Sequence, residues 1–224
     1  AGANITVANA GNTFTGTVAF AGAGGLGNVA ISDTTALDLQ AMTLGGTLNV
    51  TATAGAITNS GALAVSGAST FTANGAGGAI TLMQPGNNFA GAVSLNTVGN
   101  AAVTDLAGGL DLGASTVGGN LTATATTGGI VQSGVITTGA NGSSFTASTA
   151  AQAIDLSTQS NVFGTNSVAF TTSGAADVAV KSDALNFGTT GVGGKLTATR
   201  SEGDTPELQA PAASASAAIF TKNI

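Results

Sequence analysis

The stretch Gly86-Asn-Asn-Phe89-Ala-Gly-Ala-Val93 decides the fold class predicted for this 224-residue chain, because variants of it occur twice more. Gly11-Asn-Thr-Phe14-Thr-Gly-Thr-Val18 precedes it, and Ser160-Asn-Val-Phe163-Gly-Thr-Asn-Ser-Val168 follows it. The three phenylalanines are 75 and 74 residues apart. Self-similarity at a fixed period indicates a repeat architecture.

Other short motifs recur in the same order and at the same spacing. They are Ile5-Thr-Val7 with Ile80-Thr-Leu82 and Ile154-Asp-Leu156; Leu37-Asp-Leu39 with Leu110-Asp-Leu112 and Leu185-Asn-Phe187; Gly45-Gly-Thr-Leu48 with Gly118-Gly-Asn-Leu121 and Gly193-Gly-Lys-Leu196; and Ser69-Thr-Phe71 with Ser143-Ser-Phe145 and Ala218-Ile-Phe220. We therefore predict one domain, 1–224, built from tandem units 1–75, 76–149 and 150–224. The expected core anchors of the repeat are Phe14, Phe71, Phe89, Phe145, Phe163, Phe220, Leu48, Leu121 and Leu196.

The third unit differs from the other two at one place. Units one and two read Ile57-Thr-Asn-Ser-Gly61 and Ile130-Val-Gln-Ser-Gly134, whereas the third reads Glu202-Gly-Asp-Thr-Pro-Glu-Leu-Gln-Ala-Pro211. Proline cannot donate a backbone hydrogen bond to a β-ladder. We therefore expect an exposed loop over about 201–218 in place of a strand.

Within a unit, apolar and polar residues alternate over short runs such as Leu37-Asp-Leu39 and Leu48-Asn-Val50. Alternation with period two predicts β-strands, and Gly, Asn and Ser separate the runs. No amphipathic helix longer than two turns is evident, so we expect an all-β chain with about eight or nine short strands per unit. Independent sandwiches of this size would be very small. A parallel β-solenoid, in which coils stack and bury an apolar stripe, fits better. We expect three strands per coil and about three coils per unit.

The composition excludes several classes of function. The chain has no Cys and no His, which removes disulfides, thiol chemistry and the commonest metal ligand and general base. Four cations against ten acids give a net charge of −6, so nucleic acid is not an expected partner. There is no run of 18 apolar residues that would cross a membrane as a helix.

The runs 86–105 and 118–134 resemble the repeats of filamentous-haemagglutinin-like exoproteins, which are very large secreted bacterial surface proteins. The resemblance covers nearly the whole chain except about 201–218, and its motifs are degenerate glycine-rich β-repeats. It implies a right-handed parallel β-helix, secretion across an outer membrane and a role as an adhesin shaft or surface fibre. Nothing in this chain matches the secretion domain of that family, and the resemblance transfers no functional residue.

Gly22-Ala-Gly-Gly-Leu-Gly27 matches a dinucleotide-binding fingerprint by letter. That site needs a following helix whose N-terminus binds pyrophosphate, and Asn28-Val-Ala-Ile-Ser-Asp33 instead predicts a strand. We therefore interpret this run as a glycine-rich corner and expect no cofactor.

The acidic residues raise the question of a metal site or of glycosidase chemistry. Glycosidases need two carboxylates facing one cleft, and aromatic sugar platforms such as Trp and Tyr are absent here. Asp38 and Asp111 recur at one repeat position, which favours an outward turn or ladder role. Asp33, Asp105 and Asp183 are the candidate ligands for a sporadic calcium ion, an alternative that the sequence leaves open.

The threonine segments Thr51-Ala-Thr53, Thr122-Ala-Thr-Ala-Thr126 and Thr197-Ala-Thr199 resemble the outward Thr-x-Thr rows of ice-binding solenoids. Such a plane needs a pair on every coil, about 4.8 Å apart. The aligned pairs recur once per unit, so we interpret them as ordinary β-surface.

These features predict a non-enzymatic, extracellular structural segment of a bacterial surface fibre or adhesin. The chain spans three units in phase, so its expected partners are other copies, joined head to tail as a filament, or flanking repeats of a longer chain. A host or surface glycan is a further candidate ligand. The alternatives are a surface-layer lattice subunit and an ice- or carbohydrate-binding solenoid.

Overall fold

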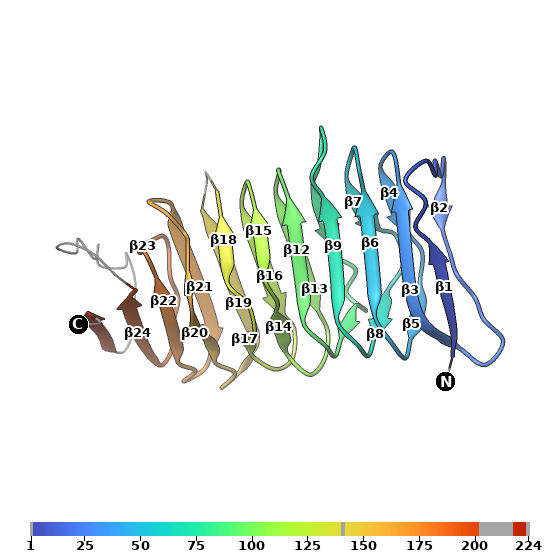
Figure 1. Cartoon of the computed structure of the whole chain (residues 1–224). Helices are drawn as coiled ribbons and strands as arrows, with labels where there is room; N and C mark the ends of the chain where they lie inside the picture. Colours follow the sequence, from blue (N-terminus) through green and yellow to red (C-terminus); the bar gives the residue numbers. More distant parts are fainter. Residues whose placement is uncertain (1, 140–141, 202–216, 223–224) are drawn as a thin grey trace.

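The computed structural model confirms the all-β parallel β-solenoid, and it describes residues 2–139 and 142–201 and the backbone of 217–222. The chain winds into a rod of about nine turns, with β1 and β25 at opposite ends (Figure 1). At about 4.8 Å per turn, nine turns correspond to a rod of roughly 43 Å. In the described part of the chain no helix occurs, and hence none long and apolar enough to span a membrane.

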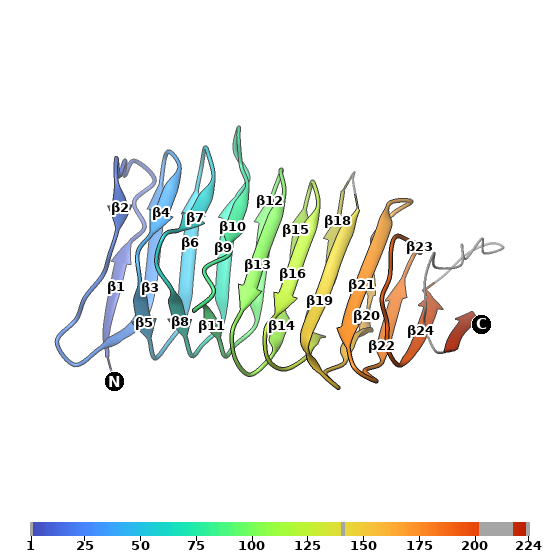
Figure 2. The same cartoon turned by 180° about the vertical axis from the view of Figure 1, so that it is seen from behind.

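Two sheets run along the rod and cover its opposite sides (Figure 2). The first sheet contains β1 (Ala3–Val7), β3 (Leu26–Asp33), β5 (Met42–Leu44), β6 (Leu48–Ala52), β8 (Leu63–Val65), β9 (Ser69–Ala73), β11 (Asn88–Phe89), β12 (Val93–Thr97), β14 (Leu110–Leu112), β15 (Ser115–Val117), β17 (Ile130–Gln132), β18 (Ile136–Thr138), β20 (Ile154–Asn161), β22 (Val178–Ser182), β24 (Lys195–Arg200) and β25 (Ala217–Lys222). The second contains β2 (Thr17–Val18), β4 (Leu37–Leu39), β7 (Ile57–Asn59), β10 (Ile80–Leu82), β13 (Ala101–Asp105), β16 (Leu121–Ala125), β19 (Ser143–Ala150), β21 (Ser167–Ser173) and β23 (Asn186–Phe187).

Successive coils pair in parallel and mostly in register, so residues at one inward position form a row along the lumen. One such row is Val103, Ala123, Phe145 and Phe170, all buried. The row begins with the smaller side chains of Val103 and Ala123 and continues with two phenylalanines on adjacent coils. The Phe145 and Phe170 rings stack with their centroids 5.5 Å apart.

Most coils contain three strands, as expected, for example β4, β5 and β6 in the first unit and β16, β17 and β18 in the second. Each of the first two units spans three and a half coils, half a coil more than the three expected. Ile5, Ile80 and Ile154 occupy one repeat position, yet they lie in β1 of the first sheet, β10 of the second and β20 of the first. Between β1 and β10 the chain crosses from one sheet to the other seven times. Each unit therefore turns the next by half a coil.

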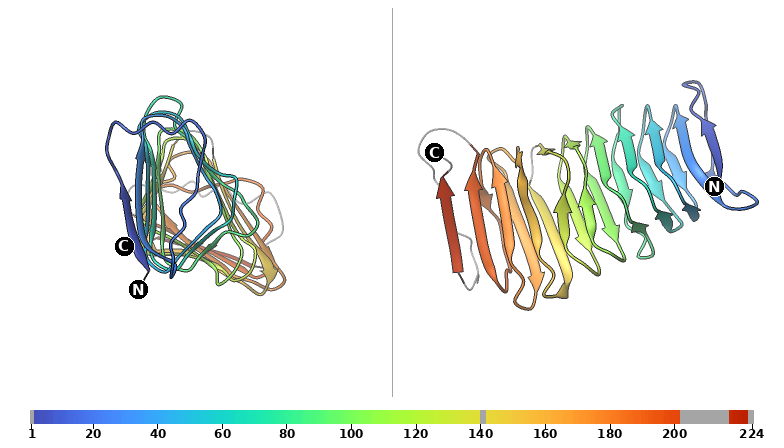
Figure 3. Two further views of the ribbon diagram at one scale, coloured as in Figure 1. Left: turned by 90° about the vertical axis from the view of Figure 1, so that its right-hand side faces the viewer. Right: turned by 60° about the horizontal axis from the view of Figure 1, so that its bottom comes forward.

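The half-turn also changes which sheet holds the two short strands that follow each other closely within a coil. In the first unit these pairs are β4 with β5 and β7 with β8. The first strand of each pair belongs to the second sheet and the other strand to the first sheet. In the second unit the equivalent pairs, β14 with β15 and β17 with β18, belong to the first sheet. Seen along the axis, the outlines of the N-terminal and C-terminal coils accordingly do not superpose (Figure 3, left).

Close stacking of the coils explains why glycine is frequent at their corners. A Cβ atom on Gly139 would lie 1.8 Å from the carbonyl oxygen of Gly118 on the previous coil. The Gly139 N–H also donates to the Val117 carbonyl at 2.7 Å. A side chain at this corner would therefore force two hydrogen-bonded coils apart.

The predicted core anchors fall into three groups. Seven are fully buried in the lumen, with at most 1% of the residue exposed: Phe71, Phe89, Phe145, Phe163, Leu48, Leu121 and Leu196. Phe14 is half-buried and packs against the core from the first coil. The side chain of Phe220 lies outside the described residues, as does nearly all of the predicted loop 201–218, whose last two positions begin β25.

The aromatic row predicts unequal costs of truncation. Phe145→Ala should lower the free energy of unfolding by about 3–5 kcal/mol, because it leaves a cavity between two other rings. Phe14→Ala should cost much less, since that ring is half-exposed. Chemical denaturation followed by circular dichroism measures both variants, and equal losses would contradict this account of the lumen.

Candidate functional site at the unit junctions

A buried asparagine joins the first unit to the second. Asn87 is fully buried and precedes β11. Its Oδ1 accepts hydrogen bonds from Asn59 Nδ2 at 2.7 Å and from the Leu63 N–H at 2.9 Å, both in the preceding unit. Its Nδ2 donates to the Leu82 carbonyl at 3.0 Å. One side chain thus satisfies polar groups on both sides of the boundary between the two units.

The boundary between the second and third units has the same arrangement. Asn161 Oδ1 accepts from Gln132 Nε2 at 2.9 Å and from the Ile136 N–H at 3.0 Å. Asn161 Nδ2 donates to the carbonyls of Leu156 and Lys181 and to Gln132 Oε1. Because a buried amide without partners would cost about 1–3 kcal/mol, these networks fix how the units meet.

Asn12 occupies the corresponding position in the first unit. Its Nδ2 donates to the Val7 carbonyl at 2.8 Å and to the Ser32 carbonyl at 3.3 Å, as Asn161 Nδ2 does to Leu156 and Lys181. Within the described ranges, no donor reaches Asn12 Oδ1. The nitrogen side of the junction is therefore complete here and the oxygen side is open.

Phe89 and Phe163, which follow Asn87 and Asn161 by two residues, each pack against the preceding unit. Phe89 meets Phe71 edge to face at 6.2 Å between ring centroids, and Phe163 meets Phe145 at 5.9 Å. Such aromatic pairs stabilise by about 0.5–1.5 kcal/mol beyond their buried area. We call the asparagine and phenylalanine together the junction pair.

Each junction phenylalanine is also held through its backbone by the next coil. The N–H groups of Phe14 and Phe89 donate to carboxylates, Asp33 Oδ2 at 2.9 Å and Asp105 Oδ1 at 2.7 Å. The Phe163 N–H donates instead to Ser182 Oγ at 3.3 Å. The acidic side chains of the first two units therefore act as acceptors inside the junction.

Asp105 has the most unusual environment of these acceptors. The residue is fully buried, and its Oδ2 atom has no hydrogen-bond partner. Burial raises the pKa of this carboxyl from 3.8 to about 6, although the backbone N–H groups of Phe89 and Ala107 act in the opposite direction. Desolvation therefore outweighs hydrogen bonding at this carboxyl.

The candidate calcium ligands Asp33, Asp105 and Asp183 lie in separate units, about one unit apart. Asp33 Oδ1 accepts from the N–H and hydroxyl of Thr35, and Asp183 Oδ1 accepts from Ser182 Oγ and the Ala184 N–H. Among the described residues, no three acidic, His or Cys side chains form a group that could hold a metal ion. Calcium binding stays a prediction for this chain.

The three aligned threonine pairs begin in β6, β16 and β24, which alternate between the two sheets. A different row is continuous: Thr104, Thr124, Thr146 and Thr171 pair in register along the second sheet. Thr124, Thr146 and Thr171 thus present outward hydroxyls on three consecutive coils, whereas Thr104 at the end of the row is buried. The aligned pairs contribute only Thr124 to this row, and the period of the repeat does not indicate its other members.

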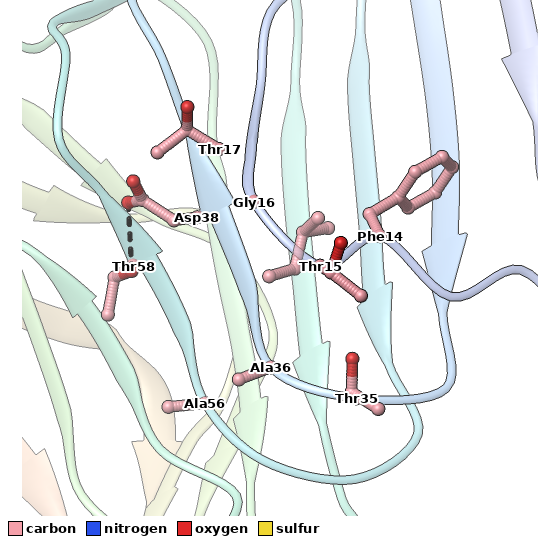
Figure 4. A pocket seen from close by; sticks show the side chains of 10 residues that line it. Phe14, Thr15, Gly16, Thr17, Thr35, Ala36, Asp38, Ala56 and Thr58 are labelled. Carbon is pink, nitrogen blue, oxygen red and sulfur yellow. Dashed lines mark hydrogen bonds between the residues drawn. The ribbon is translucent and has the colours of Figure 1, made fainter.

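A shallow depression of about 450 Å³ lies beside β2, β4 and β7 near the N-terminal end (Figure 4). Phe14 forms one side of it, and Asp38 accepts a hydrogen bond from Thr58 Oγ1 at 2.9 Å on the other. Threonine, alanine and glycine line most of the rest, and Asp38 is the one carboxylate in this lining.

These features define the chain as a repeat-built parallel β-solenoid with internal unit junctions. The family described as repeats of unknown function (DUF5649) matches residues 26–96 and 98–169, more than half of the chain, and the chain belongs to this family. The two matches begin 72 residues apart, in agreement with the internal period. No curated protein and no solved structure matches the chain.

The environment of Asp105 predicts a pH-dependent stability. Because Asp105 binds a proton more tightly in the folded state than in the unfolded state, its contribution to stability is fully present below about pH 4 and is lost as the pH rises through about 6. The difference between the two pKa values corresponds to about 3 kcal/mol. Asp105→Asn, which keeps an acceptor for the Phe89 N–H, should flatten this dependence in urea unfolding between pH 4 and 8. An equally steep dependence in the variant would assign it to another group.

Proposed function

We propose that the chain is a structural segment of an extracellular bacterial fibre or adhesin, in which it acts as a stiff spacer. The observation that carries this proposal is the continuity of the core and the backbone ladders across both unit boundaries. Bending or extending such a rod would break hydrogen bonds on several adjacent coils together. A spacer needs this property and needs no reactive side chains.

Membership in a repeat family supports the same role, because stacked repeats lengthen a protein without adding a new kind of contact. The sequence resemblance to filamentous-haemagglutinin-like exoproteins supplies the finer part of the proposal, namely secretion and a place on the cell surface. Low charge and abundant Thr, Ser, Asn and Gly are consistent with a surface that resists proteases by tight strand pairing.

The regular threonine row favours a second candidate function, binding to an ordered flat surface such as ice. Thr124, Thr146 and Thr171 present hydroxyl and methyl groups at the spacing of the coils, about 4.8 Å. Thr122 and Ser144 form a parallel row two residues away on two of these coils. Thr104, the next member of the row, is buried, so the exposed plane ends at Thr124.

The spacer proposal predicts where the chain is found and what shape it has. Antibodies against the purified chain should label intact cells of the bacterium that encodes it. Small-angle X-ray scattering should give a rod of roughly 43 Å, the length of nine stacked coils. Labelling only after cell lysis, or a compact sphere in solution, would contradict the proposal.

Ice binding predicts thermal hysteresis of the purified chain. Thr124→Tyr should abolish it by interrupting the row, whereas Thr70→Tyr, on β9 of the first sheet, should leave it unchanged. A freezing point equal to the melting point in the unsubstituted chain would remove this second candidate.

A further inference from the structure

The first coil presents an end face whose apolar side chains are less buried than their counterparts elsewhere. Among the side chains that the structure describes, four apolar ones pack only partly buried against the core, and all of them lie in this coil: Ile5, Phe14, Val18 and Phe20. Their repeat counterparts in the second unit are at most 1% exposed: Ile80, Phe89, Val93 and Leu95. Those in the third unit are fully buried: Ile154, Phe163, Val168 and Phe170. We call Ile5, Asn12, Phe14, Val18 and Phe20 the N-terminal end face.

The preceding unit is what covers these positions in units two and three. Ile80 pairs with Ile57 and Ile154 with Ile130, so the strand that carries Asn59 or Gln132 always lies on this edge. Leu95 pairs with Phe71 and Phe170 with Phe145, so a phenylalanine strand lies on the other edge. In the first unit β1 pairs with β3 and β2 pairs with β4, which leaves one edge of each strand open among the described residues.

The polar part of the end face shows the same incompleteness. Asn12 Nδ2 makes the hydrogen bonds of a junction asparagine, whereas its Oδ1 has no described donor. At the other two junctions this oxygen accepts one carboxamide N–H and one backbone N–H from the preceding unit. A partner for this face must therefore supply a carboxamide, a backbone N–H and an aromatic ring in the same geometry.

We infer that the N-terminal end face binds a repeat unit of this family that carries the Ile-x-(Asn/Gln)-Ser-Gly motif together with a following phenylalanine. The motif strand extends the first sheet at β1, and the phenylalanine strand extends the second sheet at β2. This inference deepens the proposed structural role and rests on it, because it specifies which unit can precede this one in the rod.

The sequence of the chain's own third unit meets this requirement only in part. It contains a phenylalanine at the matching position, Phe220, but no Ile-x-(Asn/Gln)-Ser-Gly motif, since 202–211 reads differently. We therefore expect the partner to be a unit that resembles the first or the second. The alternative partner is the C-terminal end of a second copy of the chain.

A chain extended at its N-terminus tests the inference. Residues 76–149 are added directly before residue 1, so that Ile5 follows the added unit as Ile154 follows unit two. Hydrogen exchange of the β1 amides should become at least about tenfold slower in the extended chain than in the original chain, because β1 gains a second neighbour. Unchanged exchange of β1 would overturn the inference.

Asn12 gives the second readout. Asn12→Ala should shift the unfolding midpoint little in the original chain, and by about as much as Asn161→Ala in the extended chain. Replacing the glutamine of the motif in the added unit by Ala should remove most of this difference, whereas Asn49→Ala, on the exposed face of β6, should act equally in both chains. An equal effect of Asn12→Ala in both chains would show that its oxygen takes no part in unit docking.

Sedimentation of the original chain over a range of concentrations separates the competing partner. End-to-end association that Asn12→Ala abolishes would identify the C-terminal end of a second copy as the occupant and would overturn the motif requirement. We expect the original chain to be monodisperse and Asn12→Ala to destabilise the extended chain more than the original one. If Asn12→Ala has the same effect in both chains, the docking inference is wrong. The spacer role is tested separately, by surface labelling and by the shape of the rod.

Discussion

Parallel backbone hydrogen bonding between successive coils is the constraint on which the other features depend. A new coil can add to the stack only if its inward residues fall in register with those of the coil before it. This requirement produces rows such as Ile31, Val50 and Phe71, which share one side of the lumen. It also limits side chains at the corners, where successive backbones lie only about 4.8 Å apart. The high Gly content of the sequence follows from the second of these limits.

The sequence predicts the architecture well because alternation with period two is a local signal. Leu37-Asp-Leu39 has the same buried, half-buried, buried pattern in the structure that its letters indicate. The number of coils per unit is a different kind of quantity. The 75-residue period places Phe71 and Phe145 at one repeat position, and nothing local shows that these residues lie in different sheets. Coil length depends on which strands pair, which the repeat alone does not specify.

The sequence motif identifies the asparagine of each junction but not its hydrogen-bond partners. Asn12, Asn87 and Asn161 stand at one position of the motif that identified the repeat. Their partners differ in residue type and lie 28 and 29 residues earlier in the chain, as Asn59 and Gln132. Asp33 and Asp105 were interpreted as polar residues or candidate calcium ligands because their contact with a phenylalanine N–H forms only when coils stack. The sequence signal for the asparagine contacts is the alignment of Asn59 in the first unit with Gln132 in the second, which the prediction did not use.

The half-turn between units has a consequence for how a long array of them would be seen by its surroundings. A residue that occurs once per unit faces one side of the rod in odd-numbered units and the opposite side in even-numbered units. An antibody, phage or host receptor approaching from one direction would meet it only at every second unit, roughly 34 Å apart. Diversification of a single repeat position would thus alter two opposite stripes of antigenic surface together, at half the density that the repeat count suggests.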